Sequence, residues 1–85
     1  MMFYRVYLTR RALKDLERLP EDVRKRIGAA IDLLSAKGRA AGARKLATKG
    51  WRVRVGDYRV LFHIDDAERL ITIFRIRHRK EAYRR

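Results

Sequence analysis

Arginine dominates the residues of this sequence that could take part in chemistry. Arg52, Arg54 and Arg59 lie within "WRVRVGDYRV", and Arg75 and Arg77 lie within the later run "LITIFRIRH". A guanidinium keeps its charge at physiological pH and donates paired hydrogen bonds to a phosphate. These residues therefore favour phosphate binding and stabilisation of negative charge in a transition state.

The run "WRVRVGDYRV" has the pattern of a β-hairpin. Apolar and basic residues alternate on both sides of Gly56-Asp57, which is a natural two-residue turn. That turn places Arg54 opposite Arg59, although like charges directly opposite each other destabilise a sheet. A bound anion between the two would remove the repulsion, so the hairpin indicates an anion site. A solvated face with splayed side chains is the alternative.

The alternation also assigns faces to the strands. Trp51, as a core residue, is expected on the apolar side of the hairpin, and His63 is expected to be an ordinary sheet residue. In the last strand, residues 70–77, one set is expected to face the core: Leu70, Thr72, Phe74 and Ile76. The other set is expected to continue the basic face: Ile71, Ile73, Arg75 and Arg77. Five arginines would then converge on one open face, unless a one-residue shift of register exchanges the two sides.

The C-terminal run "IRHRKEAYRR" adds further charged and ionisable groups. His78 exchanges protons near neutral pH, unless it is simply solvated. Tyr83 either stacks on a base, acts as an acid or base, or packs the tail against the domain.

The elements that must position these residues are visible upstream. Residues 3–8 have the pattern of a strand, and Thr9 is a plausible N-cap for a helix that ends near Leu19. Pro20 starts a second helix, whose apolar face consists of Val23, Ile27, Ala30, Ile31 and Leu34. The following run "KGRAAGAR" is typical of a loop. The order predicts an α+β fold, strand-helix-helix-strand-strand-strand, with a helical hairpin packed on one face of a mostly antiparallel four-stranded sheet.

Composition narrows the choice of partners. The 85 residues predict one domain, and the net charge of +13 favours phosphate-rich or acidic partners. Residues 44–85 hold 13 basic and five acidic side chains. The chain has no cysteine, and no apolar run approaches the ~20 residues that span a bilayer. We therefore expect a cytoplasmic protein with no membrane contact, no cofactor and no metal site.

Several of these segments resemble the RelE branch of the RelE/ParE superfamily of bacterial and archaeal toxins. They are "YLTRRALKDLERLPEDVRKRI", "ARKL", "WRVRVGDYRVLFHID" and "IRHRKEAY", of which "RVRVGDYRVLF" and "HRKEAY" are the most specific. The resemblance implies a RelE-like microbial RNase architecture over residues 1–85. It implies a metal-free, ribosome-dependent endoribonuclease that cleaves mRNA in the ribosomal A site, by attack of the 2′-hydroxyl on the adjacent phosphate. A cognate antitoxin would silence it.

The resemblance also implies roles for individual residues. Arg59 and Tyr83 match catalytic positions, either Arg77 or Arg79 matches the basic residue ahead of the tyrosine, and His78 is a further catalytic candidate. The residues assigned to RNA binding are Arg52, Arg54, Arg75, Lys45 and Lys49.

The match departs from the family pattern at two positions. The best-known members have lysines where this chain has Arg52 and Arg54, and an arginine cannot serve as a general base. Proton removal then falls to Tyr83, to His78, or to a ribosomal or RNA group.

Two alternatives follow from the same resemblance: a ParE-like inhibitor of DNA gyrase, and an inactive homologue that binds RNA or ribosomes. Because the chain is strongly basic, the antitoxin is expected to bind it through an acidic or amphipathic segment. Part of its contact is expected on exposed Leu61, Ile71 and Ile73.

Overall fold

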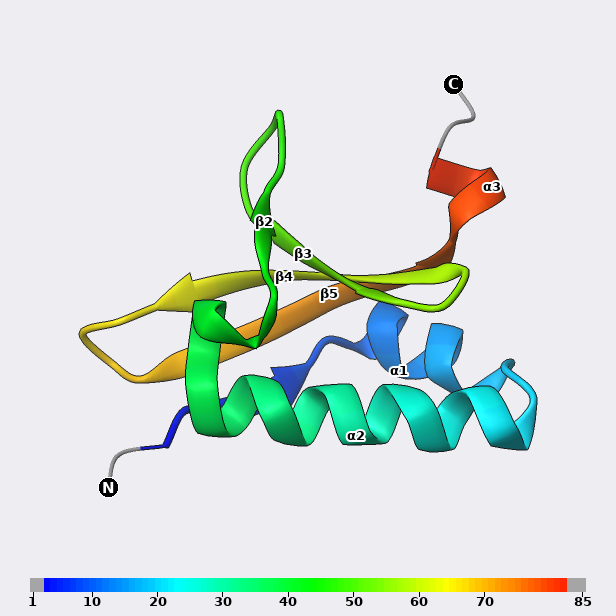
Figure 1. Ribbon diagram of the computed structural model, residues 1–85, viewed down its shortest axis with the longest axis horizontal. Coiled ribbons are helices and arrows are strands. Elements are labelled where there is room, and N and C mark those ends of the chain that lie inside the picture. Colours follow the sequence, from blue (N-terminus) through cyan, green and yellow to red (C-terminus); the bar gives the residue numbers. More distant parts are fainter. Residues whose placement is uncertain (1–2, 83–85) are drawn as a thin grey trace.

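The computed structural model describes residues 3–82, which form two layers (Figure 1). Helices α1 (Arg10–Glu17) and α2 (Glu21–Lys37) cover one face of a five-stranded sheet. The predicted α+β fold, with a helical hairpin on one face of the sheet, is therefore confirmed. The other face of the sheet, called the outer face below, points away from both helices.

The sheet has one strand more than predicted. Its strands are β1 (Arg5–Leu8), β2 (Arg44–Lys45), β3 (Trp51–Val55), β4 (Tyr58–Asp65) and β5 (Leu70–His78), in the spatial order β1-β5-β4-β3-β2. β1 pairs with β5 in parallel, and all other neighbours are antiparallel. The additional strand is β2, which lies with the 3-10 helix η1 (Gly38–Ala41) in and beside the predicted loop. Two residues are too few to show an alternation, so β2 has no periodic signal.

The two helices begin where the sequence predicts. The Thr9 side chain caps α1, because its Oγ1 accepts a hydrogen bond from the Ala12 N–H at 3.2 Å. Pro20 has a φ of −57° and occupies the N-cap of α2, where the missing N–H is not needed. α2 buries Ile27 and Leu34 one above the other, which confirms its predicted apolar face.

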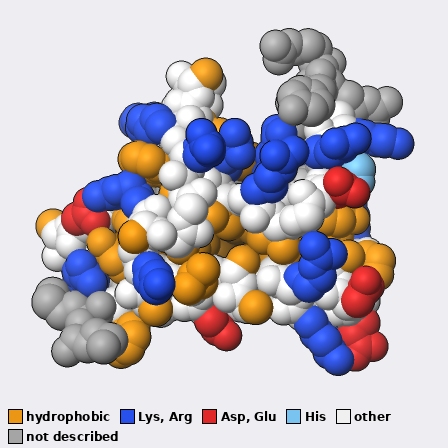
Figure 2. Space-filling view, in the orientation of Figure 1, with side chains coloured by type: hydrophobic (Ala, Val, Ile, Leu, Met, Phe, Trp, Pro, Cys, Tyr) orange, Lys and Arg blue, Asp and Glu red, His pale blue; other side chains and the backbone are white. Residues whose placement is uncertain are grey.

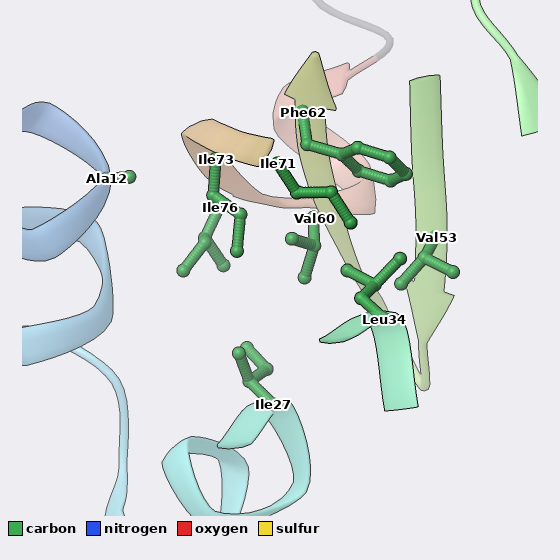
Figure 3. Packing of buried hydrophobic residues seen from close by; sticks show 9 residues of the cluster. All are labelled: Ala12, Ile27, Leu34, Val53, Val60, Phe62, Ile71, Ile73 and Ile76. Carbon is green, nitrogen blue, oxygen red and sulfur yellow. The ribbon is translucent and has the colours of Figure 1, made fainter. Parts of the chain in front are cut away.

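The hydrophobic core lies between the helices and the sheet (Figure 3). Its buried side chains are Ala12, Ile27, Leu34, Val53, Val60, Phe62, Ile71, Ile73 and Ile76. Every helix of the hairpin and each of β3, β4 and β5 contributes to it. The core therefore fixes the positions of the three strands that carry the arginines.

Gly56 is required at the β3–β4 turn. Its φ is +59°, whereas Asp57 does not have a positive φ, as in a type II′ hairpin turn. A Cβ atom at position 56 would lie 2.6 Å from Nη2 of Arg26 on α2. The turn that sets the hairpin register therefore needs glycine for its backbone angle, whereas the end of the flexible Arg26 side chain could move away.

Within residues 3–82, no helix is both long enough and apolar enough to cross a membrane.

Candidate nucleic-acid interface

Three arginines from three adjacent strands form a row across the outer face. Arg54 of β3 lies opposite Arg59 of β4, and Arg59 lies opposite Arg77 of β5. Their sequence neighbours Val53, Val60 and Ile76 are buried under the helices, so the arginines project to the other side. Side chains directly opposite each other have Cβ atoms about 4.5–5.5 Å apart. The sheet therefore brings three cations together in the way that the hairpin pattern predicts.

Beyond this row, the predicted assignment of β5 residues to the two faces of the sheet is wrong. The pairing of β4 with β5 shifts between Leu61 and Phe62, so that Leu61 lies opposite Arg75 and Phe62 lies opposite Ile73. This β-bulge adds one residue to β5, and the alternation changes sides there. Ile71 and Ile73 are consequently fully buried in the core and are not exposed between the arginines.

An ion pair with α1 engages Arg75, which lies opposite Leu61 just before the bulge. Its Nε donates to Oδ2 of Asp15 on α1 at 2.8 Å, and its Nη2 lies 3.4 Å from Oδ1. Asp15 Oδ2 also accepts the backbone N–H of Ile76 at 2.9 Å. The ion pair is mostly buried, with the side chains 25% and 15% exposed. Arg75 therefore ties β5 to α1, and the structure brings together four, not five, of the predicted arginines.

A second row runs beside the first and contains a residue that the sequence analysis did not consider. Arg44 of β2 lies opposite Arg52 of β3, and Arg52 lies opposite the half-buried Leu61. The only sequence signal for Arg44 is its place in "ARKL". We call Arg44, Arg52, Arg54, Arg59 and Arg77 together the arginine face.

Lys45 and Lys49 belong to neither row of arginines. Lys45 is opposite Trp51, and its Nζ lies 5.2 Å from the centre of the Trp51 ring. Both lysines line a hollow of about 360 Å³ at the start of β3, which His63 also lines. The His63 ring stacks on Phe74 with its centre 4.6 Å away, so His63 has a packing role on the outer face.

Charges on the arginine face are weakly compensated. Arg44, Arg52, Arg54 and Arg77 form no ion pair with any acidic side chain in the part of the chain that the structure describes. Arg77 Nε is buried and has no hydrogen-bond partner among residues 3–82. A buried donor without a partner costs about 1–3 kcal/mol, so this arrangement is not one that stability alone would select.

The surface shows the same distribution of charge (Figure 2). Lys and Arg side chains gather along the upper part of this view, whereas Asp and Glu side chains are scattered. The β2–β3 connection and helix α3 (Arg79–Ala82) rise on the side of the sheet away from α1 and α2 (Figure 1). They therefore flank the outer face of the sheet.

Helix α3 begins directly after β5 and is held at the β3–β4 turn. The Arg79 N–H donates to the Asp57 carbonyl at 2.7 Å, and Arg79 Nε lies 3.9 Å from Oδ1 of Asp57. The His78 ring packs edge-on against Tyr58, with ring centres 5.1 Å apart. The structure thus places Arg77 in the arginine row and Arg79 beside an acid. Tyr83 lies outside the described residues.

The hydrogen bonds of His78 limit what its ring can do. Its Nδ1 accepts the backbone N–H of Lys80 at 3.1 Å. A neutral imidazole whose Nδ1 accepts a hydrogen bond carries its proton on Nε2. In this arrangement the Nδ1 lone pair is engaged by the Lys80 N–H, and the Nε2–H is a donor.

A second cluster of charged side chains lies past the other end of β4. Tyr4 donates to Oδ1 of Asp66 at 2.7 Å, Arg39 donates to Oδ2 at 2.6 Å, and the Arg69 guanidinium lies 4.0 Å from the centre of the Tyr4 ring. The hydrogen bond from Arg39 lowers the pKa of Asp66, and the hydrogen bond to Asp66 raises the pKa of Tyr4. We call these four residues the Tyr4–Asp66 clasp. They join the N-terminal segment, η1 and the β4–β5 turn.

Comparison with known proteins identifies relatives over almost the whole chain. A family model described as the ParE toxin of a type II toxin–antitoxin system, parDE, matches residues 6–83. A comparison with curated protein sequences finds no match.

Solved structures of toxin–antitoxin complexes share the fold. A chain of the archaeal RelE–RelB complex from Pyrococcus horikoshii is 28% identical, with a TM-score of 0.80 over 92% of this chain and 97% of that chain. A chain of the RelBE2 complex from Mycobacterium tuberculosis is 29% identical, with a TM-score of 0.68 over 92% and 93% of the two chains. A double mutant of the Escherichia coli toxin RelE in the free state is 15% identical, with a TM-score of 0.77 over 96% and 88% of the two chains, and this likeness shows the fold alone.

Proposed function

The chain belongs to the RelE/ParE superfamily and is a toxin of a type II toxin–antitoxin system, and from this membership we propose that it is a ribosome-dependent endoribonuclease. It cleaves messenger RNA in the A site of cytoplasmic ribosomes. The observation that carries the proposal is the row of Arg54, Arg59 and Arg77 across three strands. Three adjacent cations on an open face fit a phosphodiester, which is the anion that a messenger RNA presents.

The proposed reaction is a transesterification within the message. The ribose 2′-oxygen forms a bond to the adjacent phosphorus, and the bond from phosphorus to the 5′-oxygen breaks. The departing 5′-oxygen takes up a proton from solvent, so the products are a 2′,3′-cyclic phosphate and a free 5′-hydroxyl. Negative charge builds up on the phosphorane, where fixed guanidinium donors stabilise it more than they stabilise the ground state.

The central position in the row suits Arg59 for contact with the phosphorane. It lies between Arg54 on one side and Arg77 on the other, so that all three can surround one phosphate. Arg52 and Arg54 hold the message on the β3 side of this site. Arg77 is the better candidate for the second catalytic arginine because Arg79 is engaged at the β3–β4 turn.

The proton of the 2′-hydroxyl needs a different acceptor. Arginines keep their charge, and Nδ1 of His78 already accepts the Lys80 N–H. These two points support Tyr83 as the base and leave His78 as a hydrogen-bond donor. The assignment of Tyr83 rests on the family resemblance of "HRKEAY".

The antitoxin partner is proposed to present an acidic or amphipathic segment to the arginine face. Leu61 lies beside Arg52 and is half-buried, so it offers an apolar contact in place of the buried Ile71 and Ile73. Binding should weaken with added salt without disappearing, because apolar contacts are insensitive to screening.

Primer extension on a defined message tests the proposed activity. Programmed ribosomes are incubated with and without the purified protein, and one lane omits the ribosomes while another contains a metal chelator. We expect cuts at A-site codons only when ribosomes are present, and with chelator as well. A folded protein, freed of any antitoxin, that makes no cuts contradicts the proposal.

The matching family model favours a second candidate function. Because that model describes a ParE toxin, inhibition of DNA gyrase is the alternative. A supercoiling assay with purified gyrase separates the two functions. Gyrase-dependent DNA breaks, together with intact message on ribosomes, would replace the ribonuclease with the gyrase inhibitor.

A further inference from the structure

Helix α1 carries basic side chains that the proposed cleavage site does not use. Plotted at about 100° per residue, its four cations fall on one arc of the helix, opposite the buried Ala12. They are Arg10, Arg11, Lys14 and Arg18. All four are exposed, and none of them forms an ion pair or hydrogen bond through its side chain with another described residue.

Two acids border this arc, Asp15 on one side and Glu17 on the other, and Asp15 is already occupied. Both carboxylate oxygens of Asp15 accept from Arg75, and Oδ2 also accepts the N–H of Ile76. Asp15 therefore contributes to anchoring α1 on β5 and does not neutralise the exposed cations. Arg75 itself lies beside this arc as a fourth guanidinium, partly exposed and paired with Asp15.

The surface is hollowed beside these residues. One hollow of about 430 Å³ is lined by Thr9, Arg10, Arg11, Phe74 and Arg75. A second of about 170 Å³ is lined by Arg11, Lys14, Asp15, Arg18 and Arg75. The two hollows share Arg11 and Arg75, and together they are called the α1 groove below.

Helix stability does not account for the charges of Arg10 and Arg11, whereas Lys14 and Arg18 stand at the C-terminal end of α1, where the helix dipole favours cations. Arg10 and Arg11 stand in the first turn of α1, which contains no acidic residue. Cations at that end of a helix oppose the helix dipole, and like charges at neighbouring helical positions repel each other. A polyanion in the groove would relieve both effects.

We propose that the α1 groove binds the phosphate backbone of folded RNA and forms the contact by which the protein holds the ribosome. The inference rests on the proposed function: the arginine face is taken by the message, so a ribosomal contact needs a second surface. A phosphate backbone fits better than an acidic peptide, because Phe74 is the only large apolar side chain that lines the groove, and polypeptide contacts depend on several such anchors. Double-stranded RNA is recognised through its shape and phosphates, without a sequence code.

The test compares two variants that each lose three positive charges. The groove variant is Arg11→Gln, Lys14→Gln and Arg18→Gln. The matched control is Arg5→Gln, Lys25→Gln and Lys37→Gln, which are exposed residues outside the groove. Lys25 has only an exposed partner, Glu21, at 3.8 Å, and such a pair contributes little to stability. Circular dichroism verifies that both variants fold.

Binding to an unbroken RNA duplex of about 20 base pairs is measured by fluorescence anisotropy at several salt concentrations. We expect the groove variant to bind at least about tenfold more weakly than the control variant, with a salt slope lower by about 2–3. The protein concentration for half-maximal cleavage on ribosomes should rise by a similar factor. Equal duplex affinity of the two variants, or no duplex binding by the wild type, overturns the inference.

The two proposals fail separately in this design. If the wild type cleaves no message, the proposed ribonuclease activity is wrong. The duplex measurement still tests whether the α1 groove binds RNA. If the groove variant loses affinity for polyglutamate and keeps its affinity for the duplex, the groove binds an acidic protein segment, and the RNA assignment is wrong.

Discussion

Arginines near the two ends of β4 have opposite surroundings. Near its start, Arg59 lies between Arg54 and Arg77, and neither of these neighbours forms an ion pair with a described acid. Just past its end, Asp66 accepts hydrogen bonds from Arg39 and Tyr4. The two positions are seven residues apart, which is roughly 23 Å along a strand.

The difference separates charges that hold the fold from charges that serve a ligand. In the Tyr4–Asp66 clasp each cation meets a carboxylate or an aromatic ring, and the contacts join segments distant in the sequence. On the arginine face, arginines of neighbouring strands lie opposite one another. One guanidinium nitrogen of Arg77 is buried there without a described partner. We infer that substitutions at the first site change stability and substitutions at the second change RNA cleavage.

The largest expected effect comes from Arg59→Ala. Loss of the central donor to the phosphorane should slow message cleavage by about 10²–10³-fold, which is typical of a donor that acts in the transition state. The variant should remain folded, because Arg59 is not one of the buried core side chains. Single-turnover cleavage and a thermal melt measure the two effects. An unchanged rate would remove Arg59 from the site.

Gly38→Ala tests the clasp end of the comparison. Gly38 has a φ of +57°, and a Cβ there would lie 2.7 Å from Cε1 of Tyr4. The variant should therefore lose about 1–3 kcal/mol in its free energy of unfolding, measured with urea. Cleavage at a temperature where the variant remains folded should match the wild type. A loss of activity in the folded variant would show that the two regions are coupled.

Arg54→Thr is expected to act in opposite directions on stability and function. Threonine suits a strand and removes one of two like charges in register, so stability should rise by about 0.2–1 kcal/mol at low salt. Added salt should reduce that gain, since screening already weakens the repulsion in the wild type. Affinity for message-programmed ribosomes should fall. A variant less stable than the wild type would indicate that Arg54 has a structural partner.

Acid is expected to weaken the clasp. The pKa of Asp66 is lowered from its ordinary 3.8 mainly by the hydrogen bond from Arg39. Its stabilising contribution is therefore present above that value and is lost as the pH falls through the folded-state pKa. The stability difference between wild type and Asp66→Asn should be constant near neutral pH and shrink below about pH 4. A difference that does not change with acid would mean that the carboxylate charge is irrelevant.

Much of the fold was predictable because local patterns encode it. The Gly56-Asp57 turn determined the register of Arg54 with Arg59, and Thr9 and Pro20 marked the helix starts. The α+β fold and four arginines of the site followed from these signals.

The bulge in β5 was missed because strict alternation leaves no place for an added residue. Ile71, Ile73 and Ile76 are spaced by two and then by three, which is the break in period that a bulge produces. The pairing of Arg75 with Asp15, 60 residues away in the sequence, depends on how α1 packs against β5, and no local pattern predicts it.

The most direct test of the division between the two regions is the rate of A-site cleavage on programmed ribosomes for Arg59→Ala and Asp66→Asn beside the wild type. The account predicts a loss of at least about a hundredfold for Arg59→Ala and a rate within about twofold of wild type for folded Asp66→Asn. Cleavage at the wild-type rate by Arg59→Ala would contradict it. The same result for Arg59→Ala combined with Tyr83→Phe would be the stronger contradiction.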